Sequence, residues 1–157
     1  MSELSLVLPD DDATTRLGAA LAGLVRPGDT LLLHGAIGAG KTHLARALIQ
    51  TCLSRLEDVP SPSFTLVQTY TANGFEIWHA DLYRLSHPDE VWELGLNDAF
   101  ETAVCLVEWP DRLGTAAPAN ALHITLSDFG DGRRAVLSGE GHAALLETLA
   151  RDLRDYV

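Results

Sequence analysis

The sequence predicts a single α/β domain whose mixed sheet contains antiparallel hairpins. The first observation is a strand, a glycine-rich loop and a helix in immediate succession, "TLLLHGAIGAGKTHLARALIQ", from Thr30 to Gln50. The other two are pairs of strand-like runs joined by short turns: "SFTLVQTY" with "FEIWHADLY", and "ALHITLS" with "RRAVLSG". A chain of 157 residues buries enough surface in one core to hold these elements.

The segment before the glycine-rich loop predicts a strand and a helix. Leu4, Leu6 and Leu8 alternate as in a strand, which Pro9 would end. A helix is expected within 10–25, because the three leading aspartates supply an N-cap and negative charge at its start. Its inward face would be formed by residues at helical spacing: Leu17, Ala20, Leu21 and Leu24.

The segment after the loop predicts three helices and a buried strand. One helix is expected over about 42–52, and "SHPDEVWEL" starts another, with Pro88 suited to its first turn. "AVCLVEW" is an apolar strand, and 142–157 is an amphipathic helix. The inward residues of that last helix would be Leu145, Leu146, Leu149 and Leu153.

Composition limits the class of protein. The apolar fraction of 46% and the charged fraction of 21% are those of an ordinary globular protein. An acidic start and short apolar runs predict neither a signal peptide nor a membrane span, so we expect a cytoplasmic location. Cys52 and Cys105 lie in apolar surroundings far apart in sequence, so we expect buried thiols rather than metal ligands or a disulfide.

The net charge of −11 argues against binding of RNA or DNA by this chain alone. A basic surface normally supplies much of that affinity. Any nucleic acid is therefore expected to be held by a partner. The alternative is that the acidity only keeps the surface soluble.

The segment "GAIGAGKT" fits the phosphate-loop pattern G-x-x-x-x-G-K-[ST] completely. Its small residues let the backbone curl so that successive N–H groups point at phosphate oxygens, and the next helix adds its positive N-terminal end. The Thr42 hydroxyl would ligate Mg²⁺. Phosphate contacts are expected from Gly35, Gly38, Ala39, Gly40, Lys41, Thr42 and the backbone of His43.

Lys41 is the only lysine in a chain that has ten arginines. A compact ammonium on a flexible stem fits between the β- and γ-phosphates of a nucleotide, where a broad planar guanidinium fits poorly. The position of this lysine therefore favours nucleotide binding over the alternative, a glycine-rich turn with a lysine there by chance.

Two carboxylates at strand ends are candidates for binding a metal or positioning water: Glu108 ends "AVCLVE", and Asp81 ends "FEIWHAD". For either one, an N-cap or surface acid is the alternative. His79 shares a strand face with Asp81 and is either a proton carrier or a hydrogen-bonded structural residue. Trp109 either packs in the core or, exposed beside the site, stacks on a ligand or anchors a partner.

Five motifs follow one another in the order and spacing of a known family: "GAIGAGKT", "SPSFTLVQTY", "HADLYRL", "ELGL" and "CLVEWPDRL". From about Leu8 to Arg134 the chain closely resembles the TsaE (YjeE) family, small bacterial ATPases required for threonylcarbamoyladenosine modification of tRNA. The resemblance implies a P-loop NTPase-type three-layer sandwich, in which a mixed sheet lies between helices, that binds ATP and Mg²⁺.

The resemblance also implies roles for single residues. It makes Glu108 the Walker B acid, Asp81 the second essential acid and Trp109 part of a functional Glu-Trp pair. The expected catalytic residues are Lys41, Asp81 and Glu108. Ser63 would occupy the position of the family's usual threonine in a switch-like loop.

Two further positions of the resemblance concern the nucleotide. Arg133 matches an arginine that lies near the nucleotide in the family. The family usually has a second threonine at the position of His43, and the hydroxyl of that threonine can contact the α-phosphate. Here only the backbone N–H of His43 is expected to make a contact.

The function that the resemblance implies is that of an accessory ATPase that docks on a TsaB-TsaD complex. In that complex TsaD transfers the threonylcarbamoyl group to the adenosine beside the anticodon, and nucleotide turnover is expected to reset the complex. Hydrolysis would be slow alone and stimulated by the partners, tRNA would be contacted only indirectly, and the free chain is expected to be a monomer.

Two other functions stay open. A small-molecule kinase would need several arginines around an acceptor, and here only Arg133 and Arg134 are adjacent. A nucleotide-gated binding module would hydrolyse nothing. A GTPase is disfavoured, because the guanine motif [NT]-K-x-D would require a second lysine.

Overall fold

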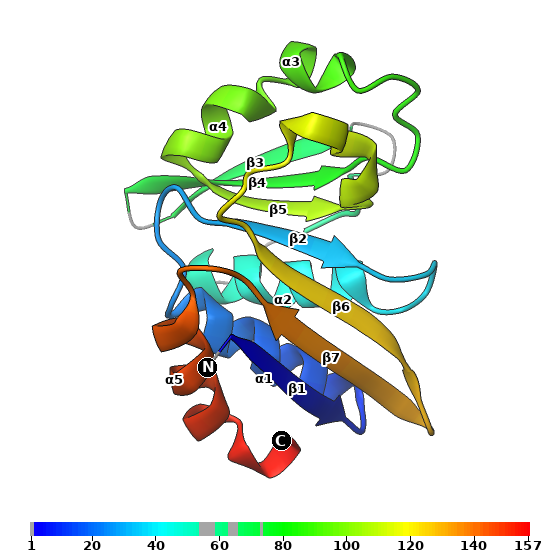
Figure 1. Cartoon of the computed structure of the whole chain (residues 1–157), viewed down its shortest axis with the longest axis vertical. Coiled ribbons are helices and arrows are strands. Elements are labelled where there is room, and N and C mark those ends of the chain that lie inside the picture. Colours follow the sequence, from blue (N-terminus) through cyan, green and yellow to red (C-terminus); the bar gives the residue numbers. More distant parts are fainter. Residues whose placement is uncertain (1, 54–58, 63–65, 73) are drawn as a thin grey trace.

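The computed structural model describes residues 2–53, 59–62, 66–72 and 74–157 (Figure 1). In this part of the chain seven strands form one sheet in the order β1-β7-β6-β2-β5-β4-β3. The strands are β1 (Glu3–Leu8), β2 (Thr30–His34), β3 (Val67–Ala72), β4 (Phe75–Asp81), β5 (Val104–Glu108), β6 (Leu122–Phe129) and β7 (Gly132–Ser138). The helices are α1 (Asp11–Ala22), α2 (Lys41–Leu53), α3 (Glu90–Leu94), α4 (Leu96–Thr102) and α5 (Ala143–Asp152), with 3₁₀ helices η1 (Pro110–Ala116) and η2 (Arg154–Tyr156).

The sheet is mixed, as the sequence predicts. Its four central strands, β6, β2, β5 and β4, run parallel. Both predicted hairpins are present, because β3 pairs antiparallel with β4 and β7 with β6, and β1 adds an antiparallel edge beyond β7. The carboxyl ends of β2, β4 and β5 therefore meet at one edge of the sheet, where α/β proteins commonly bind ligands.

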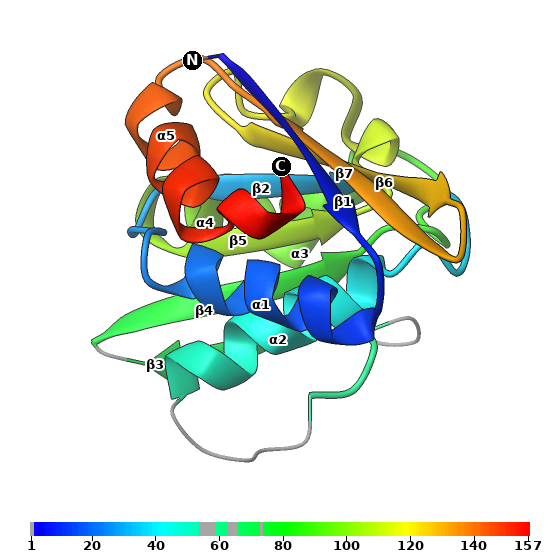
Figure 2. The same ribbon diagram turned by 90° about the horizontal axis from the view of Figure 1, so that it is seen from below.

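Helices cover both faces of the sheet, so the three-layer arrangement is confirmed (Figure 2). Leu31 and Leu33 of β2 point into a core shared with α1, α2 and α5. Leu32 points into a second core, shared with α3, α4 and η1. This alternation along one buried strand is what a sheet packed on both sides requires.

Some element boundaries differ from the sequence prediction. The strand expected over 63–70 begins at Val67, and residues 63–65 lie outside the described part of the chain. The second hairpin has a shorter turn than "DFGDG", because β6 continues to Phe129 and β7 starts at Gly132. The last helix ends at Asp152 instead of continuing to the terminus, and η2 follows it.

Two helical segments were not predicted. The helix that was expected near Pro88 is α3, which begins at Glu90. It ends before Gly95, whose left-handed φ of 82° terminates the helix. A new helix, α4, starts directly afterwards. The second unpredicted segment, η1, follows Trp109 and has Pro110 at its start.

Both cysteines are buried free thiols, as predicted. Burial raises the pKa of the Cys105 thiol to about 12. Within the described residues, none of the helices has both the length and the apolar character that a membrane crossing demands.

The helix α1 approaches α2 closely, and this contact depends on a glycine. A Cβ atom added at Gly18 would lie 2.6 Å from the Cβ of Ala47 and 3.0 Å from the carbonyl oxygen of Leu44, both on α2. Only glycine fits this contact without a shift of one helix. The position of α2, which begins at Lys41, is therefore set partly by the packing of α1.

We predict that Gly18→Ala lowers the free energy of unfolding by about 1–2 kcal/mol, because overpacking outweighs the better helix propensity of alanine. Gly23→Ala is the matched control: it has an ordinary φ of −79°, and the nearest neighbour of an added Cβ is 3.7 Å away. That control should be neutral or slightly stabilising. Urea denaturation measures both, and equal stability of the two variants would contradict the close-packing account.

Candidate functional site

The glycine-rich loop connects the end of β2 to the start of α2. Gly35, Gly38 and Gly40 have φ values of 149°, 82° and 102°, a region that favours glycine. The Ala39 N–H donates to the carbonyl of Ala36 at 3.1 Å, which closes the turn. The backbone therefore curls around the N-terminus of α2, the arrangement that phosphate loops use.

Lys41 is enclosed by its own loop and by an aromatic ring. Its Nζ donates to the Gly35 carbonyl at 2.5 Å and lies 3.4 Å from the centroid of the Trp109 ring. Burial lowers the pKa of Lys41, and the nearby carboxylates of Glu108 and Asp81 oppose this shift. The ammonium is thus placed in a partly desolvated position, where a cation gains most from a ring face or an anion.

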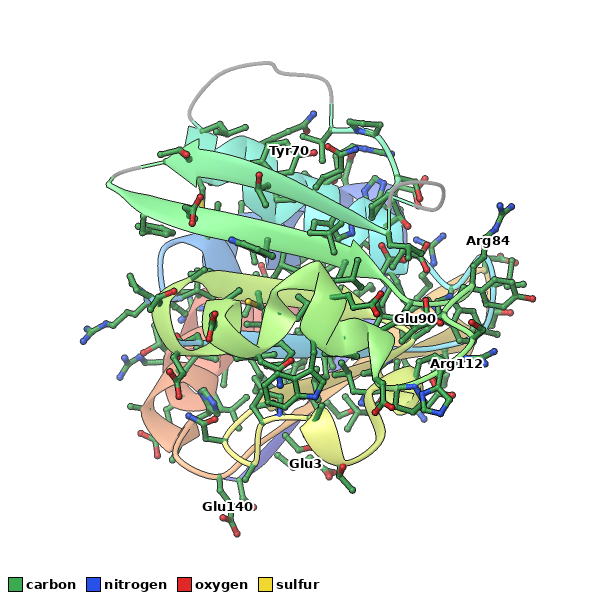
Figure 3. The ribbon with its side chains drawn as sticks, turned by 90° about the horizontal axis from the view of Figure 1, so that it is seen from above. Glu3, Tyr70, Arg84, Glu90, Arg112 and Glu140 are labelled. Carbon is green, nitrogen blue, oxygen red and sulfur yellow. The ribbon has the colours of Figure 1, made fainter. Side chains whose placement is uncertain are left out.

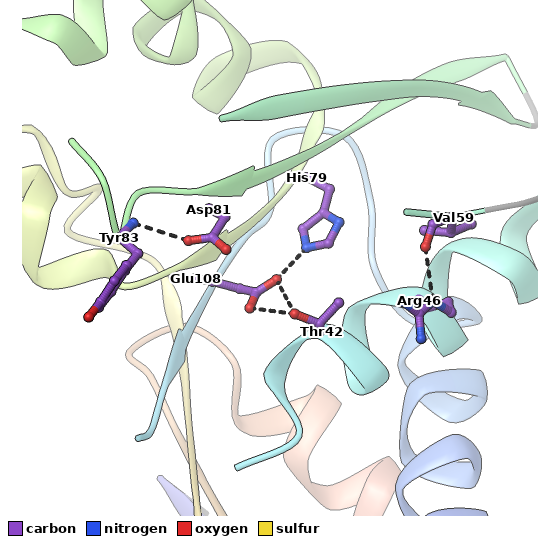
Figure 4. Close-up of polar contacts among 7 residues, drawn as sticks. All are labelled: Thr42, Arg46, Val59, His79, Asp81, Tyr83 and Glu108. Carbon is purple, nitrogen blue, oxygen red and sulfur yellow. Dashed lines mark hydrogen bonds and ion pairs between the residues drawn. The ribbon is translucent and has the colours of Figure 1, made fainter. Parts of the chain in front are cut away.

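Glu108, at the end of β5, is hydrogen-bonded from two other elements (Figure 4). The Thr42 hydroxyl donates to it, with Oε1 at 2.8 Å and Oε2 at 3.0 Å. The His79 Nε2 lies 2.7 Å from Oε2. Only 2% of Glu108 is exposed, so these contacts supply the partners that a buried carboxylate needs.

Asp81 lies beside Glu108. The two residues are paired across β4 and β5, so their side chains leave the same face of the sheet next to each other. The Asp81 carboxylate accepts a hydrogen bond from the Tyr83 backbone N–H at 3.0 Å (Figure 4). The structure therefore brings both predicted acids to one place.

Trp109 follows Glu108 in a left-handed conformation, with φ 58° and ψ 53°. A non-glycine residue rarely adopts this conformation, which marks a position where the chain is constrained. The Trp109 ring meets the Tyr83 ring at a centroid distance of 4.9 Å and a tilt of 52°. Trp109 also packs against the second core, as one of the two roles considered from the sequence requires, while stacking on a ligand or anchoring a partner stays a prediction.

A cavity of about 410 Å³ lies between the loop and the ends of β4 and β5. Its lining includes Lys41, Thr42, Asp81, Glu108 and Trp109. This volume suits a small organic ligand. These five residues, all singled out from the sequence, thus line one cavity together with Gly38, Gly40 and His43 of the loop.

The remaining predicted residues lie around the loop. The Nε2 of His43 is 2.9 Å from the Thr15 hydroxyl of α1, so its side chain is engaged with that helix. Arg133 donates to Asp11 at 3.0 Å, and its guanidinium would lie 3.0 Å from a Cβ added at Gly40. Ser63 lies outside the described residues.

Further residues line the cavity, and of these the sequence analysis missed Tyr83. Tyr83, Arg84 and Ile37 also line the cavity. The signal for the first two is their position directly after Asp81 in "DLYRL". Arg84 projects from the same end of the molecule as Arg112 (Figure 3).

A histidine pair next to the loop was missed as well. The Nε2 of His34 is 2.9 Å from the Nδ1 of His123, and the rings stack at 5.2 Å. Burial lowers the pKa of His34, and His123 and Lys41 add to this effect while Asp111 opposes it. The stacked pair therefore lies at the end of β2, directly before Gly35.

Comparison with known proteins identifies relatives over nearly the whole chain. A family model described as "Threonylcarbamoyl adenosine biosynthesis protein TsaE" matches residues 8–136. A "tRNA threonylcarbamoyladenosine biosynthesis protein TsaE" from Rickettsia felis is 32% identical over 146 residues, covering 92% of this chain and 85% of that protein. The protein of the same name from Bacillus subtilis is 32% identical over 155 residues, covering 96% of each chain. The crystal structure of Bacillus subtilis YdiB has a TM-score of 0.73 and 26% identity, covering 99% of this chain and 97% of its own.

We predict that Lys41→Ala abolishes tight binding of Mg²⁺-ATP and leaves the fold intact, because it removes a charged phosphate contact and little core volume. Arg151→Ala, which removes one positive charge from α5, is the control and should bind like the wild type. Calorimetric titration with ATP measures both. Binding by Lys41→Ala within about threefold of wild type, or about 0.7 kcal/mol, would contradict the assignment of the loop.

Proposed function

Because this chain belongs to the TsaE family, we propose that it is an ATPase that acts with a TsaB-TsaD complex in threonylcarbamoyladenosine modification of tRNA. The observation that carries the proposal is the cavity in which Lys41, Thr42 and Glu108 face one another at the end of a curled glycine loop. A loop of this shape, with these side chains, is suited to a Mg²⁺-nucleoside triphosphate.

The side chains of the cavity fit Mg²⁺. One hydroxyl and two carboxylates, from Thr42, Glu108 and Asp81, are the hard oxygen ligands that this ion prefers. Thr42 and Glu108 already lie within 3.0 Å of each other, so one small ion can be reached by both. When bound, Mg²⁺ would neutralise charge on the phosphates.

The chain's own groups supply the remaining chemistry of the proposed hydrolysis. Lys41 exchanges the Gly35 carbonyl and the Trp109 ring for phosphate oxygens, which are stronger partners for an ammonium. The backbone N–H groups of the loop hold the phosphates at the positive end of α2. Asp81 or Glu108 orients the attacking water, which is how an acid at a strand end contributes in P-loop enzymes.

The net negative charge of the chain supports the proposal that partner proteins bind the tRNA. A chain with a net charge of −11 gains little electrostatic affinity for tRNA, so the RNA would be held by the partner complex. The transfer of the threonylcarbamoyl group would then belong to TsaD, and nucleotide turnover in this chain would reset the complex.

Trp109 is placed to connect partner docking with the nucleotide. On one side it lies against the Lys41 ammonium, and on the other it meets Tyr83, whose side chain is 46% exposed. A partner that contacts Tyr83 can therefore act on Lys41 through one intervening ring. Arg84, which also lines the cavity, is the arginine nearest in sequence to a candidate acid.

We predict that Glu108→Gln and Asp81→Asn reduce ATP turnover with partners present by at least about tenfold, while ATP affinity changes by less than about threefold. The reason is that phosphate contacts survive while metal or water positioning is lost. Asp155→Asn, near the C-terminus, is the control. Phosphate release and calorimetry give the two quantities, and normal turnover in both site variants would refute the roles of these acids.

We predict that a TsaB-TsaD complex raises the ATPase rate at least about tenfold, equivalent to ~1.4 kcal/mol of transition-state stabilisation. Trp109→Ala should lose most of that rise and keep its affinity for ATP within about threefold. Trp92→Ala removes a tryptophan that is 68% exposed on α3 and should behave like wild type.

Steady-state phosphate release by each protein, alone and with the complex, separates the outcomes. Rapid turnover by the isolated chain that partners do not change would contradict the coupled-ATPase proposal.

A further inference from the structure

His79 is fully buried in β4, and among the described residues its side chain makes a polar contact with Glu108. Its Nε2 lies 2.7 Å from the Oε2 of that carboxylate. In the register of β4 and β5, His79 is opposite Leu106, so the imidazole reaches along the sheet face to the next side chain on β5. The contact therefore joins two strands on the face that α2 covers.

The tautomer of His79 follows from its partner. A carboxylate accepts hydrogen bonds, so Nε2 carries the proton and donates it to Glu108. The other ring nitrogen, Nδ1, is buried and has no hydrogen-bond partner within the described residues. An apolar side chain of similar size would fill the position without an unpaired polar atom, so packing alone does not account for an imidazole here.

The contact fixes how the Glu108 carboxylate is turned. Oε2 accepts from His79 at 2.7 Å, and Oε1 is left with the shorter of the two Thr42 contacts, 2.8 Å. Rotation of the carboxylate would break the bond to a donor that is itself locked in a strand. The carboxylate is therefore held from β4 through Oε2 as well as from α2 through both oxygens.

The Lys41 ammonium lines the same cavity as the Glu108 carboxylate. Glu108 is close enough to raise the pKa of Lys41 against the effect of burial. Nevertheless, the ammonium donates to Gly35 and lies over Trp109, while the carboxylate faces Thr42 and His79. A carboxylate without the imidazole would gain by turning toward the nearby ammonium.

We propose that His79 is a positioning residue for the metal: it holds Glu108 by Oε2 so that Oε1, beside the Thr42 hydroxyl, is available to the divalent cation of the nucleotide, and it keeps that carboxylate from pairing with Lys41. The inference rests on the proposed function, because the cation arrives with a nucleotide. Partners that orient a metal ligand from behind commonly change metal affinity by about 10–100-fold when removed.

The test compares His79→Leu with His79→Gln. The glutamine amide nitrogen can occupy the place of Nε2 and still donate, whereas leucine fills similar space without a donor. The measured quantity is the Mg²⁺ concentration that gives half-maximal binding of a non-hydrolysable ATP analogue to the full chain, followed by calorimetry. Binding of the same analogue in EDTA is measured alongside.

We expect His79→Leu to raise the Mg²⁺ midpoint at least about tenfold while binding in EDTA stays within about threefold of wild type. His79→Gln should lie within about threefold in both measurements. In a Glu108→Gln background, His79→Leu should add less than about twofold, because its effect passes through that carboxylate. If His79→Leu does not fold, His79→Asn replaces it, since asparagine is too short to reach Glu108.

Each result separates the inference from the proposed function. An unchanged Mg²⁺ midpoint in His79→Leu or His79→Asn, with normal Mg²⁺-dependent binding in the wild type, would overturn the role of His79 alone. Equal losses in the leucine and glutamine variants would also overturn it, because they would reflect packing. Absence of Mg²⁺-dependent binding in the wild type would overturn the proposed function and this inference together.

Discussion

The buried carboxylate of Glu108 is the constraint on which the site depends. A charge that is only 2% exposed must be hydrogen-bonded, and its partners come from the start of α2 and from the middle of β4. The strand order makes this contact available, because β5 lies between β2 and β4 and all three run parallel. One side chain thus fixes the phosphate loop relative to the sheet edge that carries Asp81.

The counterpart of this carboxylate is the Lys41 ammonium. It is kept apart from the acids by the Gly35 carbonyl and the Trp109 ring, which are weaker partners than a phosphate. The cavity therefore holds a positive group in a chain whose net charge is −11. Trp109 gains its position from a left-handed backbone conformation directly after Glu108, so the carboxylate of Glu108 and the exposed ring of Tyr83 are connected through two successive residues.

The parts of the fold and of the site that follow local patterns were predictable from the sequence. The loop from Gly35 to Thr42, the flanking β2 and α2 and both hairpins are set by glycine placement, apolar periodicity and short turns. The order of the strands, the contact of His79 with Glu108 across 29 residues and the stacking of His34 on His123 across 89 are set by tertiary packing, which local patterns do not encode. The helix α4 was missed because a glycine such as Gly95 signals the end of a helix and does not signal the start of the next one.

The central claim is that the space around Lys41, Thr42 and Glu108 binds the phosphates of a Mg²⁺-nucleotide. A crystal structure with Mg²⁺ and a non-hydrolysable ATP analogue tests it most directly. The account predicts a phosphate chain within the curl of the loop, the Lys41 Nζ moved from the Gly35 carbonyl to phosphate oxygens, and the contact of His79 with Glu108 unchanged. A nucleotide bound elsewhere, with Lys41 still against Gly35 and Trp109, would contradict it.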